Sequence, residues 1–295
     1  MTVYSQISQN KAKTFLIMLI FIILFSGFFY LIGEYFDSPG AYLVLGLLIS
    51  SVSSIASYFY SDKMVLFTTG ARPAKKKDFF DFYTTTENLA IAAGLPMPRL
   101  FVIDDPSPNA FATGRDPAHA VVCATTGLLK SLDRSDIEGV ISHELSHVKN
   151  YDILVSSIVA VLVGTLALLS DWIMRSLWWG RGRDDNRDRS PISAILFVVV
   201  LIITPIVATL IQLAISRRRE FLADASGVLI TRNPEGLASA LEKIAAFPPI
   251  RNPSPSTAHL FIASSFKKKR QASWLTNLFS THPPIEERVR ILRSM

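Results

Sequence analysis

The chain has 295 residues, 49% of them hydrophobic, and its 30 lysines and arginines exceed its 24 aspartates and glutamates to give a net charge of +6. Its length predicts about two domains, and its positive mean hydropathy of +0.34 indicates membrane segments. Cys123 is the only cysteine in the sequence, which excludes an intrachain disulfide and favours a buried structural thiol in a reducing compartment.

Two apolar runs near the amino terminus, residues 15–32 and 41–60, are each long enough to cross a hydrocarbon core of about 30 Å. The first run is too long for a cleavable signal peptide and lacks a small-residue cleavage site. Lys11 and Lys13 precede it, residues 34–40 carry only acidic charges, and basic residues follow the second run. The positive-inside rule therefore predicts a cytoplasmic amino terminus and a return of the chain to the cytoplasm.

The polar segment that follows predicts a small mixed unit of helix and strand. Residues 78–93 have apolar side chains at helical spacing. Three short apolar stretches indicate strands at residues 100–103, 109–114 and 120–124. Ser135 and Glu138 have the spacing of a capping box, which predicts that a helix begins there.

Inside that helix, His143 and His147 lie four residues apart, with Glu144 beside the first. Residues i and i+4 share one face of a helix, so both imidazoles can bind one metal ion. Glu144 lies off that face and is free to exchange a proton with water at the metal, as in zinc-dependent peptide hydrolysis. The alternative is a surface helix with two unremarkable histidines, and the apolar residues at helical spacing around the motif argue against it.

Two further apolar runs, residues 153–169 and 192–215, predict a second membrane hairpin between the two halves of the catalytic domain. The loop between them, residues 171–190, contains five arginines, which disfavour an external location and leave a differently packed hairpin as the alternative.

The basic residues cluster at membrane flanks, where anionic headgroups attract them, and the run 267–270 lacks interleaved aromatics. Nucleic acid is therefore not an expected partner. The scarcity of ionisable residues in the four runs also argues against a transporter.

A zinc site needs a third protein ligand, and Glu220 is an attractive candidate. Glu220 and Asp224 share one face of a helix predicted over residues 217–230, so Glu220 can bind the metal while Asp224 accepts a hydrogen bond from a ligand histidine. Glu220 could equally pair with the arginines that precede it. The remaining histidines that could complete the site are His119, His259 and His282.

The carboxyl-terminal part predicts two more helices. Asn233 and Pro234 have the character of an N-cap and first position of a helix that extends to residue 247, and residues 283–293 form the other helix. Residues 248–281, between them, are predicted to be irregular and mobile. The predicted fold is therefore mainly α with a small β-sheet (α+β) and about four transmembrane helices. Its predicted divisions are a membrane hairpin at 1–62, half of a metalloprotease domain at 63–152, a second hairpin at 153–215 and the other half at 216–295.

The chain resembles the HtpX-type membrane zinc metalloproteases, relatives of the CAAX prenyl proteases, along essentially its whole length. The resemblance is carried by the motif at 143–150, the Glu220/Asp224 pair, Asn-Ala-Phe-Ala-Thr-Gly at 109–114 and Ser-Thr-His-Pro-Pro-Ile-Glu-Glu-Arg at 280–288. It implies one Zn²⁺ per chain, with ligands His143, His147 and Glu220. It also implies that Glu144 is the catalytic acid/base and that Asp224 supports a ligand.

The same resemblance implies how substrate is held. Asn109, Ala110, Phe111 and Ala112 are expected to form an edge strand near the cleft, to which a substrate strand could add. His282 and Arg288 are expected to approach the active site and to stabilise the oxyanion or hold substrate.

The implied function is that of a metalloendopeptidase of the cell (inner) membrane, acting on misfolded or damaged membrane proteins on the cytoplasmic side as part of the stress response. One alternative is a CAAX-type processing protease, although the chain is short for a large multi-span chamber. The other is a membrane scaffold that binds metal without catalysis, which predicts no hydrolysis that depends on Glu144.

Overall fold

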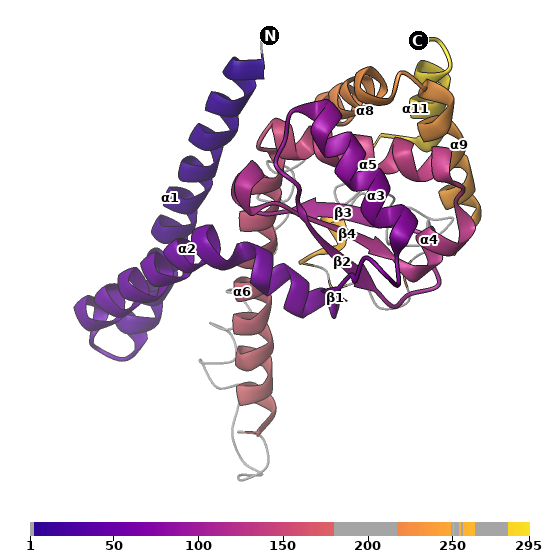
Figure 1. The fold of residues 1–295 in the computed structure, drawn as a ribbon. Helices are drawn as coiled ribbons and strands as arrows, with labels where there is room; N and C mark the ends of the chain where they lie inside the picture. The colour runs from indigo at the N-terminus through magenta and orange to yellow at the C-terminus, as the bar shows by residue number, and fades with distance from the viewer. Residues whose placement is uncertain (1–2, 180–216, 249, 251–253, 255, 263–282) are drawn as a thin grey trace.

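The computed structural model describes residues 3–179, 217–248, 250, 254, 256–262 and 283–295. Two long helices, α1 (Val3–Tyr35) and α2 (Pro39–Thr69), pack along each other as a hairpin. In Figure 1 this hairpin and the far half of α6 (Asp152–Trp179) project away from the part of the molecule that contains the sheet. Large apolar side chains are exposed along both helices of the hairpin, as lipid contact requires.

Three helices of the described chain are long and apolar enough to cross a membrane. Their candidate spans are Gln6–Glu34, Pro39–Thr69 and Asp152–Asp171. They coincide with the first three predicted runs, and the second continues past residue 62. The fourth predicted span, residues 192–215, lies outside the described residues.

A four-stranded mixed sheet lies at the centre of the remaining chain. Its strands are β1 (Arg72–Pro73), β2 (Arg99–Ile103), β3 (Ala110–Thr113) and β4 (Val121–Thr125), in the order β1-β2-β4-β3. β2 and β4 are parallel, whereas β1 and β3 pair antiparallel with their neighbours. β3 and β4 are wholly buried, as their apolar sequences predict, and β1 is a strand that the sequence did not indicate. The prediction of a mainly helical protein with a small sheet is confirmed.

Helices surround this sheet, and α5 (Arg134–Lys149) lies among them, in contact with β3 and four other helices. The remaining described helical elements are α3 (Phe80–Ala93), η1 (Pro117–His119), α4 (Thr126–Ser131), α8 (Arg217–Thr231), α9 (Pro234–Ala246), η3 (Ala258–Leu260) and α11 (Ile285–Leu292). Two glycines allow α5 to approach its neighbours closely. A Cβ atom at Gly139 would lie 2.5 Å from the nitrogen of Leu237 on α9, and one at Gly227 on α8 would lie 3.0 Å from Oγ of Ser142.

The start of α5 differs from the prediction. Asp133 is the N-cap: its side chain accepts from the nitrogen of Asp136 at 3.0 Å, and the Asp136 carboxylate accepts from the nitrogen of Asp133 at 3.3 Å. The capping box predicted at Ser135 and Glu138 is therefore wrong by two residues, because a carboxylate two positions earlier takes that role. Glu138 instead forms an exposed ion pair with Arg134 at 3.2 Å.

The carboxyl-terminal elements agree with the sequence in one respect and differ in another. Asn233 caps α9 by accepting from the nitrogen of Gly236, which confirms the predicted cap. In contrast, residues 256–262, within the stretch predicted to be irregular and mobile, are buried and include η3. The ring of Phe261 packs edge-on against Phe111 at 5.1 Å, so this segment fills space beside β3.

Candidate metal centre

Three side chains from two helices converge at one point. The Nε2 atoms of His143 and His147, on α5, lie 3.2 Å apart. Carboxylate oxygens of Glu220, on α8, lie 3.9 Å from Nε2 of His143 and 3.6 Å from Nε2 of His147. The structure therefore brings together the two motif histidines and a glutamate more than seventy residues away in the sequence, and this group could hold a metal ion.

The donor set fits a divalent metal of the zinc type. Bonds of about 2.0–2.1 Å at tetrahedral angles place donor atoms roughly 3.3 Å apart, close to the separations seen here. Each imidazole also has its second nitrogen, Nδ1, next to a carboxylate oxygen. Nδ1 of His143 lies 2.8 Å from Asp224, and Nδ1 of His147 lies 3.0 Å from Asp152. Such hydrogen bonds put the ring proton on Nδ1 and leave the lone pair of Nε2 directed at the metal position.

The partner of His143 is itself held by a buried arginine. Arg288, on α11, is 0% exposed and donates twice to Asp224, from Nε to Oδ2 at 2.9 Å and from Nη2 to Oδ1 at 2.6 Å. Burial alone would raise the pKa of Asp224, but the hydrogen bond from His143 and the charge of Arg288 outweigh it and hold that pKa below its ordinary value. Asp224 therefore stays ionised and can accept a hydrogen bond from the protonated Nδ1 of His143.

The partner of His147 was not found from the sequence. Tyr151 adopts a left-handed backbone conformation, with φ at 60°, between the end of α5 and the start of α6. This turn brings the Asp152 carboxylate back to Nδ1 of His147. The only local signal is an acidic residue five positions after His147, and sequence spacing does not reveal that the helix ends between the two.

The catalytic acid/base candidate, Glu144, is buried on the same helix, with 3% of its surface exposed. Burial, aided by the charge of Glu144, raises the pKa of the Cys123 thiol on β4. Cys123 is buried, as the sequence predicted, and the raised pKa keeps its thiol protonated.

A model of peptidase family M48 matches residues 78–295. The chain belongs to peptidase family M48. Among its relatives, the "Protease HtpX homolog" of Tropheryma whipplei (strain Twist) is 47% identical over 99% of this chain and 98% of its own length. The "Protease HtpX homolog" of Caldanaerobacter subterraneus subsp. tengcongensis is 42% identical over 100% of this chain and 98% of its own length. This M48 protease is therefore of the HtpX type, as the sequence motifs predicted.

A solved structure, that of S. mikatae Ste24p, aligns with 92% of the M48 protease at 18% identity and a TM-score of 0.49. The chain spans 62% of the length of that protein.

In the M48 protease, strand β3 contains the residues predicted to bind substrate. Ala110, Phe111 and Ala112 lie in β3, the last strand of the sheet, and Asn109 immediately precedes it. The carbonyl oxygen of Ala110 accepts a hydrogen bond from the nitrogen of Ile262 at 3.0 Å. A substrate strand adding at Ala110 would therefore have to replace the contact with Ile262.

The other histidines lie apart from the three converging side chains or outside the described chain. His119 is half exposed and bonds Asp116 through Nδ1 at 2.7 Å. His259 is buried, with Nε2 3.1 Å from the carbonyl oxygen of Ser156. His282 lies outside the described residues.

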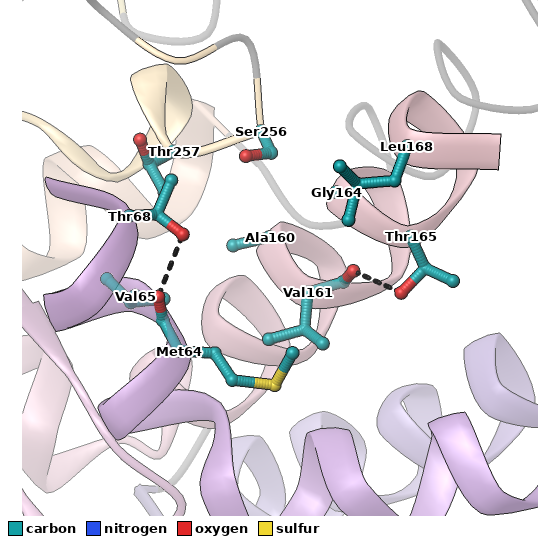
Figure 2. A pocket seen from close by; sticks show the side chains of 10 residues that line it. All are labelled: Met64, Val65, Thr68, Ala160, Val161, Gly164, Thr165, Leu168, Ser256 and Thr257. Carbon is teal, nitrogen blue, oxygen red and sulfur yellow. Dashed lines mark hydrogen bonds between the residues drawn. The ribbon is translucent and has the colours of Figure 1, made fainter. Parts of the chain in front are cut away.

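A separate hollow lies between α2, α6 and residues 256–257 (Figure 2). It has an empty volume of about 380 Å³ and apolar walls that include Val65, Ala160 and Leu168. The hydroxyls of Thr68 and Thr165 are bonded to carbonyl oxygens of their own helices, so they leave the walls largely apolar. His143, His147 and Glu220 are not among its lining residues, and the hollow is thus distinct from the candidate metal centre.

Metal binding by the protease should depend on pH. Burial alone would lower the pKa of His147, but the hydrogen bond to Asp152 and the charge of Glu220 outweigh it and raise the pKa to about 9. Below pH 9 a metal ion must therefore displace a proton, and affinity should rise about tenfold per pH unit. The raised pKa of His147 also means that its protonation stabilises the fold of the metal-free protein. This stabilisation is fully present below pH 6.5 and is lost as the pH rises through 9.

Competition with a chromophoric chelator of known proton affinity, measured between pH 6 and 9, tests this dependence. An affinity that stays flat over that range would show that His147 is already neutral in the metal-free protein.

Proposed function

We propose that this protein is a zinc-dependent endopeptidase with His143, His147 and Glu220 as ligands. The observation that carries the proposal is the convergence of two imidazole Nε2 atoms and one carboxylate, with both Nδ1 atoms next to carboxylates. Two nitrogens and one oxygen from the protein leave a further coordination position open, as catalytic zinc sites require.

Glu144 is the proposed acid/base. A bound zinc ion would supply a Lewis acid that polarises the scissile carbonyl and makes water more acidic. Glu144 would accept a proton from the attacking water and return it to the nitrogen of the departing amine. Its burial next to the two ligand histidines supports this role, because proton transfer requires a fixed carboxylate close to the reacting atoms.

Arg288 is proposed to act through Asp224. Its guanidinium is buried and donates to that carboxylate twice, which supports a role in holding His143 rather than a direct contact with substrate. Stabilisation of the oxyanion therefore remains a proposal for His282 alone.

The proposed substrates are misfolded or damaged membrane proteins, cut on the cytoplasmic side. Asp152, the partner of His147, is the first residue of the candidate span Asp152–Asp171, so the metal centre lies at the end of a membrane helix. The basic residues that flank the first two spans support a cytoplasmic location for this end. An extended segment of substrate would add to β3 by replacing the hydrogen bond between Ala110 and Ile262.

Reconstitution in lipid vesicles tests the substrate class. We expect the protease to cut the exposed loops of a destabilised membrane protein, with activity lost to a chelator and restored by zinc. A stable variant of the same membrane protein, which offers no extended segment, is the matched control and should survive. Cleavage of soluble unfolded chains such as β-casein, with the destabilised membrane protein spared, would refute the proposed substrates.

A further inference from the structure

A buried polar cluster connects the first membrane helix to the metal centre. Asn10, on α1, is 4% exposed and donates through Nδ2 to Oδ1 of Asp152 at 2.8 Å and to the carbonyl oxygen of Asn150 at 2.9 Å. The other carboxylate oxygen of Asp152 lies 3.0 Å from Nδ1 of His147. One carboxylate therefore contacts α1 through one oxygen and a proposed metal ligand through the other.

The side-chain amide of Asn10 also contacts α8, the helix that carries Glu220. Arg219, which precedes Glu220 on α8, donates through Nη1 to Oδ1 of Asn10 at 3.5 Å and to Oδ1 of Asp152 at 3.3 Å. The backbone carbonyl oxygen of Asn10 separately accepts from the hydroxyl of Thr14 at 2.9 Å. Both ends of the Asn10 carboxamide are thus used, and a buried polar network in which every group is bonded is rigid.

We infer that Asn10 is a positioning residue of the metal centre, which holds Asp152 in the orientation that fixes the ring of His147. The inference rests on the proposed role of His147 as a metal ligand. Without the Asn10 donor, Arg219 alone would hold Oδ1 of Asp152, and the carboxylate could rotate away from His147. The first membrane helix is then a working part of the active site as well as an anchor.

The size of the effect follows from the position of Asn10 in this chain of contacts. Loss of a group that bonds a metal ligand directly weakens metal binding by about 10- to 100-fold. Asn10 acts one hydrogen bond further out, so we expect its removal to weaken zinc binding about three- to tenfold.

Zinc affinity of the full-length protein in detergent, measured by chelator competition, tests this inference. Asn10→Leu keeps the shape of the side chain and removes its donor. Asn10→Ala also removes the donor without adding bulk, and it decides the outcome if the leucine variant does not fold. Gln9→Ala is the matched control, because it removes an exposed amide from the preceding position of the same helix. We expect weaker zinc binding in both Asn10 variants and none of this loss in the control.

A double-mutant cycle separates positioning from general destabilisation. Asp152→Ala should weaken zinc binding about 10- to 100-fold, and adding Asn10→Ala should then change nothing, because the intermediary is gone. The inference is overturned if Asn10→Ala lowers zinc affinity equally in the wild type and in Asp152→Ala, or if zinc affinity is unchanged in the Asn10 variants. In either case the proposed function stands. A wild-type protein that binds no zinc overturns both.

Discussion

Glu144→Gln should abolish proteolysis and leave metal binding intact. The glutamine keeps the size and hydrogen-bonding shape of the side chain but cannot accept a proton at neutral pH. General acid–base groups contribute about 10²- to 10⁴-fold to enzymatic rates, and we expect a loss at the upper end because Glu144 would serve both proton transfers. The measurement is cleavage of β-casein by detergent-purified protein, followed together with zinc content.

Glu138→Gln is the matched control for this experiment. Glu138 lies on the same helix, but it is exposed and pairs with Arg134 at the surface, so its replacement should leave both activity and zinc content unchanged. Equal zinc in wild type and Glu144→Gln, with hydrolysis in neither, would instead favour a metal-binding scaffold.

Asp224→Ala should be the most destabilising substitution at the metal centre. It removes the carboxylate to which the guanidinium of Arg288, 0% exposed, donates twice, and leaves that guanidinium the more distant carboxylate of Glu220, whose Oε2 lies 3.9 Å from Nη1. Breaking a buried ion pair in this way costs about 3–5 kcal/mol. The free energy of unfolding of the metal-free protein, measured in denaturant, should fall by that amount, and zinc affinity should fall about 10- to 100-fold because His143 loses the carboxylate that orients it.

Adding Arg288→Met to this variant separates the two effects. Removing the buried charge that has lost Asp224 should recover most of the stability, whereas zinc affinity should stay low, because no group then replaces Asp224 beside His143. A double variant as unstable as Asp224→Ala would show that the guanidinium is not the cause. Glu235→Ala is the control, because Glu235 and Arg293 form an exposed pair at the surface and water screens their interaction, so stability should change little.

The parts of the protein that depend on local sequence could be predicted. The first three apolar runs are helices, the three strands that were indicated are present, and Asn233 caps α9 as expected. The four-residue spacing of His143 and His147 placed both imidazoles on one face of α5, because helix geometry alone fixes that relation.

The parts that depend on packing between distant segments could not be predicted. Sequence spacing could not decide whether Glu220 binds the metal or pairs with the arginines that precede it. The close approach of α8 to α5 at Gly227 brings Glu220 to the histidines. The contact of Asn10 with Asp152 joins residues 142 positions apart, and no local pattern reports it. The capping box at Asp133 and Asp136 was missed for a different reason, since two carboxylates three apart satisfy the same geometry as serine and glutamate.

The position of Arg288 in α11 has a consequence for biosynthesis. The partner of His143 is secured only when a helix close to the carboxyl end packs behind it, and the partner of His147 is secured by a residue of the first helix. In a nascent chain Asn10 is therefore made before His147 and Asp152, whereas Arg288 is made after His143 and Asp224. The orientation of His143 is therefore complete only once α11 has been synthesised and Arg288 has reached Asp224.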